Sequence, residues 1–304
     1  MPDISAWYKE VIKDKVTIKF QAHGGMLDGT MMGGDTEAGT VKFPILNSEL
    51  TMYKLTGAIQ PIPTTKVDVG TVPIQMDDFE SVAWWLTQDA YKAGPSEQDA
   101  AARAVVKSQR RKRDSIKIEA LRTFANLGGS GVTTIGTGAE RPDILHFEQA
   151  RAEIAATGAE SEEDIDVFTM IPEMWATQLA FYKEFADGNF VGTENMPFSK
   201  TQRMKTKTVR GVHYIVCPDS YFLEYENGKL ETFMWHKESM GAETPVNQEK
   251  VHMDRDHTKE GSPYFIKNWL SGAAIGIQGK GVKRLRLAKI TAPARPVVET
   301  KEVA

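Results

Sequence analysis

The residues best suited to metal chemistry lie in the segment HMDRDH, toward the end of the chain. If this segment forms a strand, His252, Asp254 and Asp256 share one face, because side chains alternate between the two faces of a strand. One imidazole and two carboxylates can together bind a divalent ion, as in a metal-dependent enzyme. The polar end of a solvated strand explains the same residues, and we favour that interpretation.

Two further candidates for catalysis are poorly supported by their surroundings. Cys217 would share a strand face with His213 in VHYIVC, but this segment is apolar and favours a buried, unreactive cysteine. The loop GGSGVTTIGTG from Gly128 follows a helix and lacks the glycine order of a nucleotide-binding loop. Ser130 does not fit an esterase elbow, because Val132 stands where the second glycine belongs. The sequence therefore predicts no catalytic constellation, no metal site and no cofactor.

A dense run of cations is the third feature with chemical meaning. Five of the seven residues from Lys107 to Arg113 are basic, whereas the whole chain has 37 Lys and Arg against 41 Asp and Glu. On a helix, Arg103, Lys107, Arg110 and Lys117 fall on one side, and we call these four residues the basic stripe. Such cations contact nucleic-acid phosphates or the carboxylates of another protein chain.

The composition limits the function further. A chain of 304 residues can bury a large core and usually forms two or more domains. Its single cysteine excludes an intrachain disulfide and a zinc site built on several cysteines, which suits a reducing cytoplasm. The sequence shows no membrane-spanning apolar run and no signal peptide at its start. A formal charge of −4 argues against a protein that coats DNA over its whole surface.

The first predicted element needs a binding surface outside itself. Residues 3 to 20 begin with an amphipathic helix whose apolar residues are Ile4, Trp7, Tyr8, Val11 and Ile12. The glycine-rich stretch HGGMLDGTMMGGD then separates this short helix from the rest of the chain. We expect Trp7, Val11 and Ile12 to dock the helix on another surface.

An extended ribbon is predicted next. Residues 39 to 76 contain two segments rich in Val, Ile and Thr, joined by the turn segment AIQPIP. Pro44 and Pro73 remove ladder donors and favour edge strands. No nearby helix could cover the ribbon, and an isolated ribbon is marginal in water. It therefore either folds onto its own domain or lies across a neighbouring subunit.

A long helix is predicted from Ser96, which can cap it, to Asn126, with Gly128 and Gly129 ending it. At 1.5 Å per residue it would be about 45 Å long, which exceeds the ordinary globular helix. Its apolar side rotates past Asp114. This rotation predicts a bend or a change of packing partner near the middle.

The remaining chain is predicted to mix helices and strands. Residues 142 to 248 include a helix opened by Pro172 and a hairpin with the two-residue turn Asn227-Gly228. Residues 249 to 290 are rich in strands. The fold class predicted from these elements is α+β.

The order of these segments resembles that of the major capsid proteins of tailed bacteriophages, which share the Johnson fold. The resemblance extends from Ser5 to Lys289 and is distributed over several stretches. These stretches are VPIQMDDFESVAWW, AARAVVKSQRRKRDSIKIEAL, MIPEMWATQLAFYKEFADGNFVG, TFMWHKESMG and SGAAIGIQGKGVKRLRL. The lack of a catalytic constellation agrees with a structural protein.

The resemblance implies a division of the chain. The expected parts are an N-terminal arm (1–34), an E-loop β-hairpin (35–76), a peripheral domain with a long spine helix (77–141), an axial α/β domain (142–248), return strands of the peripheral domain (249–290) and a C-terminal tail (291–304).

The resemblance also implies a function without enzymatic activity. The expected protein self-assembles into hexamers and pentamers of an icosahedral shell that encloses double-stranded DNA. Its expected partners are a portal, a separate scaffolding protein, a decoration protein and DNA held by weak, non-specific contacts, with no membrane. It would be assembled in the host cytoplasm and reside in the virion. An encapsulin-like compartment is the alternative with the same fold.

Two interpretations of the basic stripe remain open within this resemblance. The spine helix lies along the inner wall of such shells, so the stripe could meet packaged DNA. Alternatively, its cations could pair with carboxylates of a neighbouring subunit.

Overall fold

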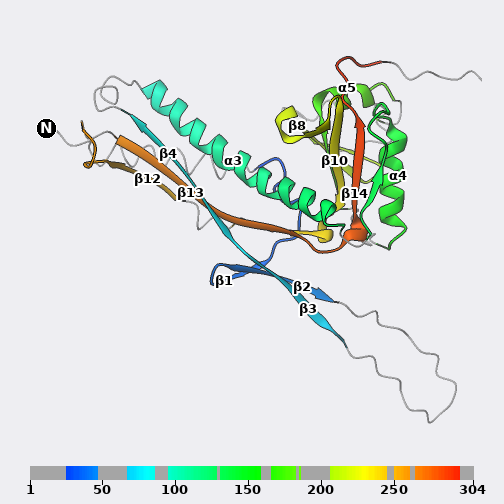
Figure 1. Cartoon of the computed structure of the whole chain (residues 1–304), viewed down its shortest axis with the longest axis horizontal. Coiled ribbons are helices and arrows are strands. Elements are labelled where there is room, and N and C mark those ends of the chain that lie inside the picture. Colours follow the sequence, from blue (N-terminus) through cyan, green and yellow to red (C-terminus); the bar gives the residue numbers. More distant parts are fainter. Residues whose placement is uncertain are drawn as a thin grey trace, which may run out of the picture.

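The computed structural model describes residues 25–46, 67–85, 95–128, 131–158, 166–182, 185, 206–244, 250–260 and 264–294. In these residues a long helix lies beside a sheet of long strands, and a compact α/β unit stands at the end of that helix (Figure 1). A narrow ribbon extends away from both (Figure 1). The predicted α+β class is confirmed.

Helix α3 (Pro95–Asn126) has 32 residues, which correspond to about 48 Å at 1.5 Å per residue. It starts with a proline, which the first turn of a helix tolerates because that N–H has no partner within the helix. The chain leaves the helix through Gly128, whose φ of 65° lies in the left-handed region. These bounds confirm the predicted long helix to within one residue.

The packing partner of α3 changes along its length. In the first half, Gln109 is buried and hydrogen-bonds to the buried Asn268 of the long-stranded sheet. In the second half, Leu121 and Ala125 are buried in the main hydrophobic core, which they share with the α/β unit. The change of packing partner predicted from the sequence is therefore confirmed.

Strand β13 (Tyr264–Gly276) organises the sheet beneath α3. Its antiparallel partners are β4 (Asp77–Trp85), β12 (Lys250–Arg255) and β11 (Met240–Glu243). A Cβ atom at Gly276 would lie 2.1 Å from the Phe124 ring of α3. Only glycine therefore lets the helix pack this closely on the end of β13.

The ribbon is an antiparallel sheet in the order β1-β2-β3. Its strands are β1 (Asp35–Glu37), β2 (Thr40–Leu46) and β3 (Val69–Gln75). Pro73 lies on the outer strand, and Pro44 lies on the part of β2 that extends beyond β1. Both prolines thus occupy edge positions, where a missing backbone donor costs little.

The base of the ribbon is covered by its own chain. Val41 and Phe43 of β2 are fully buried and pack with Ala273 of β13. A Cβ at Gly34 or at Gly241 would lie within 2.7 Å of the Phe43 ring, so the two glycines make room for it. Of the two alternatives left open by the sequence, the base of the ribbon therefore follows the first, because it folds onto its own domain.

A seven-stranded sheet forms the α/β unit, in the order β5-β14-β10-β6-β8-β7, with β9 also paired to β10. Its strands are β5 (Thr133–Ile135), β6 (Val167–Pro172), β7 (Thr206–Val209), β8 (Val212–Cys217), β9 (Leu223–Glu226), β10 (Lys229–His236) and β14 (Val282–Ala288). Helices α4 (Ile144–Ala155) and α5 (Glu173–Leu179) contact this sheet.

The core of the unit combines aliphatic and aromatic side chains, and Trp175 and Trp235 are fully buried in it. The predicted hairpin is confirmed, because β9 and β10 are joined at Gly228 with a φ of 76°. The helix predicted to open at Pro172 is also confirmed, but α5 ends at Leu179, sooner than its apolar pattern indicates.

Candidate functional site at the arm junction

The segment Gly25–Met31, which follows the predicted arm helix, lies against the middle of α3. The Asp114 carboxylate of α3 accepts hydrogen bonds from the backbone N–H groups of Met26 and Leu27, each at 3.1 Å. The side chains of Leu27 and Met31 are buried in the main core. We call this segment, together with the α3 side chains that hold it, the arm junction.

Two cations of α3 complete the arm junction. The Lys117 ammonium donates to the Leu27 carbonyl at 3.0 Å and to Asp28 Oδ1 at 2.6 Å. The Arg113 guanidinium lies 3.3 Å from Asp28 Oδ2 and also donates to the Thr244 carbonyl at 3.3 Å. A pair of i, i+4 cations on one helix thus holds one acidic side chain and the turn that carries it.

Lys117 therefore does not belong to an exposed basic stripe. Its side chain is 6% exposed and its ammonium is bound within its own chain. The prediction that this lysine faces DNA or a neighbouring subunit is wrong. The physical reason is that a carboxylate distant in the sequence folds back onto the helix and pairs with it.

The two carboxylates of the junction have opposite pKa shifts. Burial, the largest single effect, acts to raise the pKa of Asp28, but the charges of Lys117 and Arg113 together lower it below its ordinary value. For Asp114, burial prevails and raises the pKa, although its hydrogen bonds act in the other direction. Tyr221 donates its hydroxyl to Asp114 at 2.9 Å, and burial followed by the Asp114 charge raises the pKa of this tyrosine.

The end of this segment and the next residue, Met32, also contact the α/β unit and the sheet. The Trp235 indole of β10 donates to the Thr30 carbonyl at 2.9 Å. The Met32 N–H donates to the Met240 carbonyl at 2.9 Å, and the Met32 carbonyl accepts from Ala242 at 3.0 Å. The arm junction is therefore a place where α3, the α/β unit and β11 are joined by one stretch of chain.

The other three residues of the basic stripe have different environments. Lys107 is exposed on α3. Arg110 is half-buried, and burial lowers the pKa of its guanidinium despite the nearby Asp28 charge. Arg103 lies on α3, but its side chain lies outside the described residues, as do Trp7, Val11 and Ile12 of the predicted arm contact.

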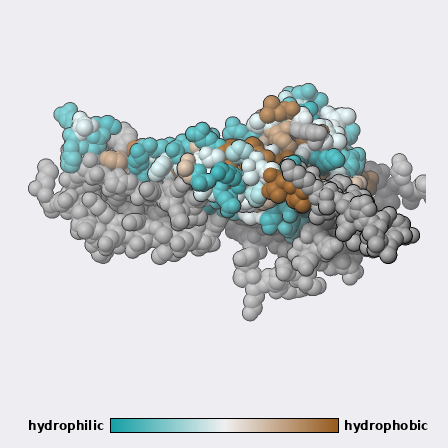
Figure 2. Space-filling view, turned by 90° about the horizontal axis from the view of Figure 1, so that it is seen from below, coloured by the Kyte–Doolittle hydropathy of each residue, from teal (hydrophilic) through white to brown (hydrophobic). Residues whose placement is uncertain are grey.

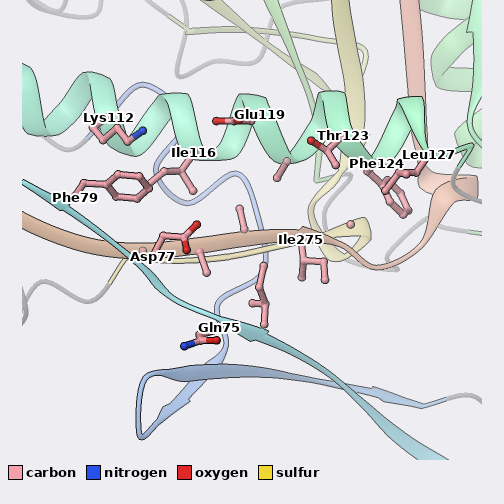
Figure 3. A pocket seen from close by; sticks show the side chains of 16 residues that line it. Gln75, Asp77, Phe79, Lys112, Ile116, Glu119, Thr123, Phe124, Leu127 and Ile275 are labelled. Atoms are coloured by element: carbon pink, nitrogen blue, oxygen red, sulfur yellow. The ribbon is translucent and has the colours of Figure 1, made fainter.

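A groove of about 570 Å³ follows another side of α3 (Figure 3). It runs between the helix and the sheet, beside the point where β3 joins β4. Its lining is mainly apolar and includes Ile74, Phe79, Ile116, Phe124, Leu127 and Ile275. Lys112 places its ammonium 3.9 Å from the centre of the Phe79 ring at one end of the groove.

Apolar groups also reach the surface elsewhere. Seen from below, the described surface is largely hydrophilic, and hydrophobic residues gather toward the α/β unit (Figure 2). Leu127 is 81% exposed where α3 ends. Val69 on the ribbon and Val82 on β4 are more than half exposed. No helix in the described part of the chain is long and apolar enough to cross a membrane.

The residues considered for metal chemistry do not form a site among the described side chains. His252 and Asp254 belong to β12, but their side chains lie outside the description. Asp256 accepts from the Thr258 N–H at 3.0 Å and lies 3.5 Å from the Lys259 ammonium, so it caps a turn. The described residues contain no cluster of three potential metal ligands.

The cysteine and histidine that were considered as a catalytic pair lie apart in the structure. Cys217 is buried at the end of β8, and His213 lies four residues earlier, about 13 Å away at the rise of a strand. His213 instead stacks on Phe168 and places Nδ1 2.8 Å from Thr208 Oγ1. This agrees with the interpretation of Cys217 as a buried structural residue.

A family model described as Phage capsid protein matches residues 4–288 of the chain. Comparison with curated proteins finds no match. Among solved structures, the capsid of Ralstonia phage GP4 matches with a TM-score of 0.60 and 8% identity, covering 87% of this chain and 89% of that one. A structure from Gordonia phage Cozz matches with a TM-score of 0.59 and 10% identity, covering 87% of each chain.

An encapsulin complex from Synechococcus elongatus also matches, with a TM-score of 0.53, 12% identity and 88% of each chain covered. At such low identity these likenesses concern the fold. They confirm the Johnson-type capsid architecture that the order of segments indicates.

Proposed function

Since the chain belongs to the phage capsid protein family, we propose that it assembles as hexamers and pentamers into an icosahedral shell around double-stranded DNA. It is a structural capsid protein of the virion and not an enzyme. The observation that carries the proposal is the family match over residues 4–288, which is nearly the whole chain.

Exposed apolar side chains support association between copies. Val69 is 64% exposed on the outer strand of the ribbon, and Val82 is 53% exposed on β4. Both lie on elements that extend away from the compact α/β unit (Figure 1). A neighbouring copy that lay along these strands would remove both valines from water.

The elements of the fold are assigned parts in this shell. We propose that residues 35–76 act as the E-loop, that 77–141 with 249–290 form the peripheral domain, and that 142–248 form the axial domain. Assembly would occur in the host cytoplasm with a scaffolding protein and a portal, and a decoration protein could then bind the outer surface. Packaged DNA would touch the inner wall only through weak contacts.

The direct test is electron microscopy of the purified protein, combined with nuclease treatment of the particles. We expect polyhedral shells with six-fold and five-fold clusters, and DNA that resists added nuclease in particles from infected cells. Small oligomers of fixed size, without shells in any condition that preserves folding, would contradict the proposal.

An encapsulin-like compartment is the second candidate, because an encapsulin complex matches the fold over 88% of this chain. The two candidates differ in content. A virion shell contains double-stranded DNA, whereas a compartment encloses protein cargo. The ultraviolet absorbance spectrum and mass spectrometry of purified particles distinguish them.

A further inference from the structure

The groove between α3 and the sheet has the length and the apolar lining of a binding site for an amphipathic helix. Its lining runs from Lys112 to Leu127, and these 15 residue steps correspond to about 22 Å. Apolar side chains line both walls, with Ile116 and Phe124 from the helix and Ile275 from the sheet (Figure 3). Helix-in-groove binding uses such a surface with apolar residues spaced at i, i+3, i+4 and i+7.

The first residues of the chain carry that spacing. Ile4, Trp7, Tyr8, Val11 and Ile12 form one apolar face if the segment is helical. These nine residue positions span about 13 Å as a helix, which is shorter than the groove. The segment itself lies outside the described residues.

The arm junction determines where the segment can reach. It fixes Met26 and Leu27 on Asp114, which lies on α3 between two residues that line the groove, Lys112 and Ile116. Residues 13 to 24 form a link of 12 residues, which can span about 40 Å when extended. This length exceeds the diameter of the helix, about 10–12 Å, plus the length of the groove.

We propose that the apolar face of residues 4 to 12 binds the α3 groove of its own subunit. A link of this length holds the segment at a local concentration of about a millimolar beside the groove. A segment from another free subunit cannot compete with it at ordinary protein concentration. The groove thus shields Trp7, Val11 and Ile12 from water in the free subunit, and the junction keeps them near it.

The test uses a bimane fluorophore, whose emission is quenched when a tryptophan side chain touches it. The label is attached to Thr123→Cys, because Thr123 lines the groove and is exposed. Cys217 is buried and common to all samples. We expect low bimane emission from the labelled free subunit. Emission should recover when the same labelled chain also carries the Trp7→Phe substitution. Phenylalanine preserves the apolar face, so this substitution tests contact and not folding.

Two controls decide the outcome. The same label on Lys107→Cys, an exposed position that does not line the groove, should be unaffected by Trp7→Phe. Mixing labelled Thr123→Cys/Trp7→Phe with excess unlabelled protein should not restore quenching if the contact is within one subunit. Restored quenching would assign the contact to another copy and overturn the proposal. Equal emission with and without the Trp7→Phe substitution in the unmixed samples would overturn it as well.

Discussion

Lys117 has the charge and helical position of a surface cation, yet it is buried against Asp28 and the Leu27 carbonyl. We expect Lys117→Met to lower the free energy of unfolding by about 2–3 kcal/mol, because it removes the closer of the two cations that pair with Asp28 and the ammonium that donates to the Leu27 carbonyl. Urea denaturation followed by circular dichroism measures this loss.

The matched control is Lys107→Met, which removes the same charge from the exposed part of the same helix. Its effect should stay within about 0.5 kcal/mol. Equal losses in the two variants would mean that the Lys117 contacts contribute nothing to folding.

Asp28 gives the arm junction a defined pH dependence. Its folded pKa lies below the ordinary value of 3.8, so its stabilisation is present above that pH and is lost as the pH falls through the folded pKa. The stability difference between wild type and Asp28→Asn should therefore be constant through the neutral range and shrink below pH 3.8. Denaturation curves at several pH values check this.

Asp35→Asn serves as the comparison, because Asp35 is exposed at the start of β1. The free energy of unfolding of the Asp35→Asn variant should stay close to that of wild type throughout the same pH series. If instead the stability difference between wild type and Asp28→Asn grew as the pH fell, the pairing of Asp28 with the cations of α3 would be refuted.

The sequence could not separate Lys117 from Lys107, because both follow the same helical spacing. What distinguishes them is Asp28, which lies 89 positions before Lys117 in the chain. Asp114 gave no signal of its role, because an acidic residue in a charged stretch of helix is ordinarily exposed to water.

Among elements, the contact between α3 and β13 depends on the absence of a side chain at Gly276. We expect Gly276→Ala to lower the free energy of unfolding by about 1–3 kcal/mol, because its Cβ would overlap the Phe124 ring. Gly33→Ala is the control, since its Cβ would meet only the end of Glu243, at 3.4 Å. Thermal unfolding of both variants measures the two losses. An unchanged stability of the Gly276→Ala variant would mean that the Phe124 ring moves aside freely.

Elements with a strong local signal could be predicted well. The long helix, the edge-type ribbon strands and the hairpin at Gly228 follow from periodicity, prolines and turn residues. The cover of the ribbon base could not, because Phe43 packs against Gly241, which lies far along the chain. The end of α5 at Leu179 could not be predicted either, since apolar spacing continues past the point where the backbone turns.

For the whole molecule, the remaining stripe residues distinguish DNA contact from subunit contact. If Lys107 and Arg110 face the shell interior, Lys107→Gln with Arg110→Gln should leave empty shells intact and reduce DNA retention, with the difference largest at low salt. Sedimentation separates empty from full particles and counts both.

A different result is expected if these cations pair with carboxylates of a neighbouring subunit. The double variant would then assemble poorly before any DNA enters, and few shells of either density would sediment. That outcome would leave the DNA-facing interpretation without support.

The Phe43 side chain anchors the base of the ribbon to the rest of the subunit. The strands extend away from the rest of the subunit (Figure 1), while this one ring is seated against Gly34 and Gly241 at their base. A force on the far part of β2 and β3 therefore acts on the small cluster of Val41, Phe43 and Ala273 that holds the base of the ribbon. A larger residue in place of either glycine would displace this ring, so we expect it to change the direction in which the ribbon leaves the subunit.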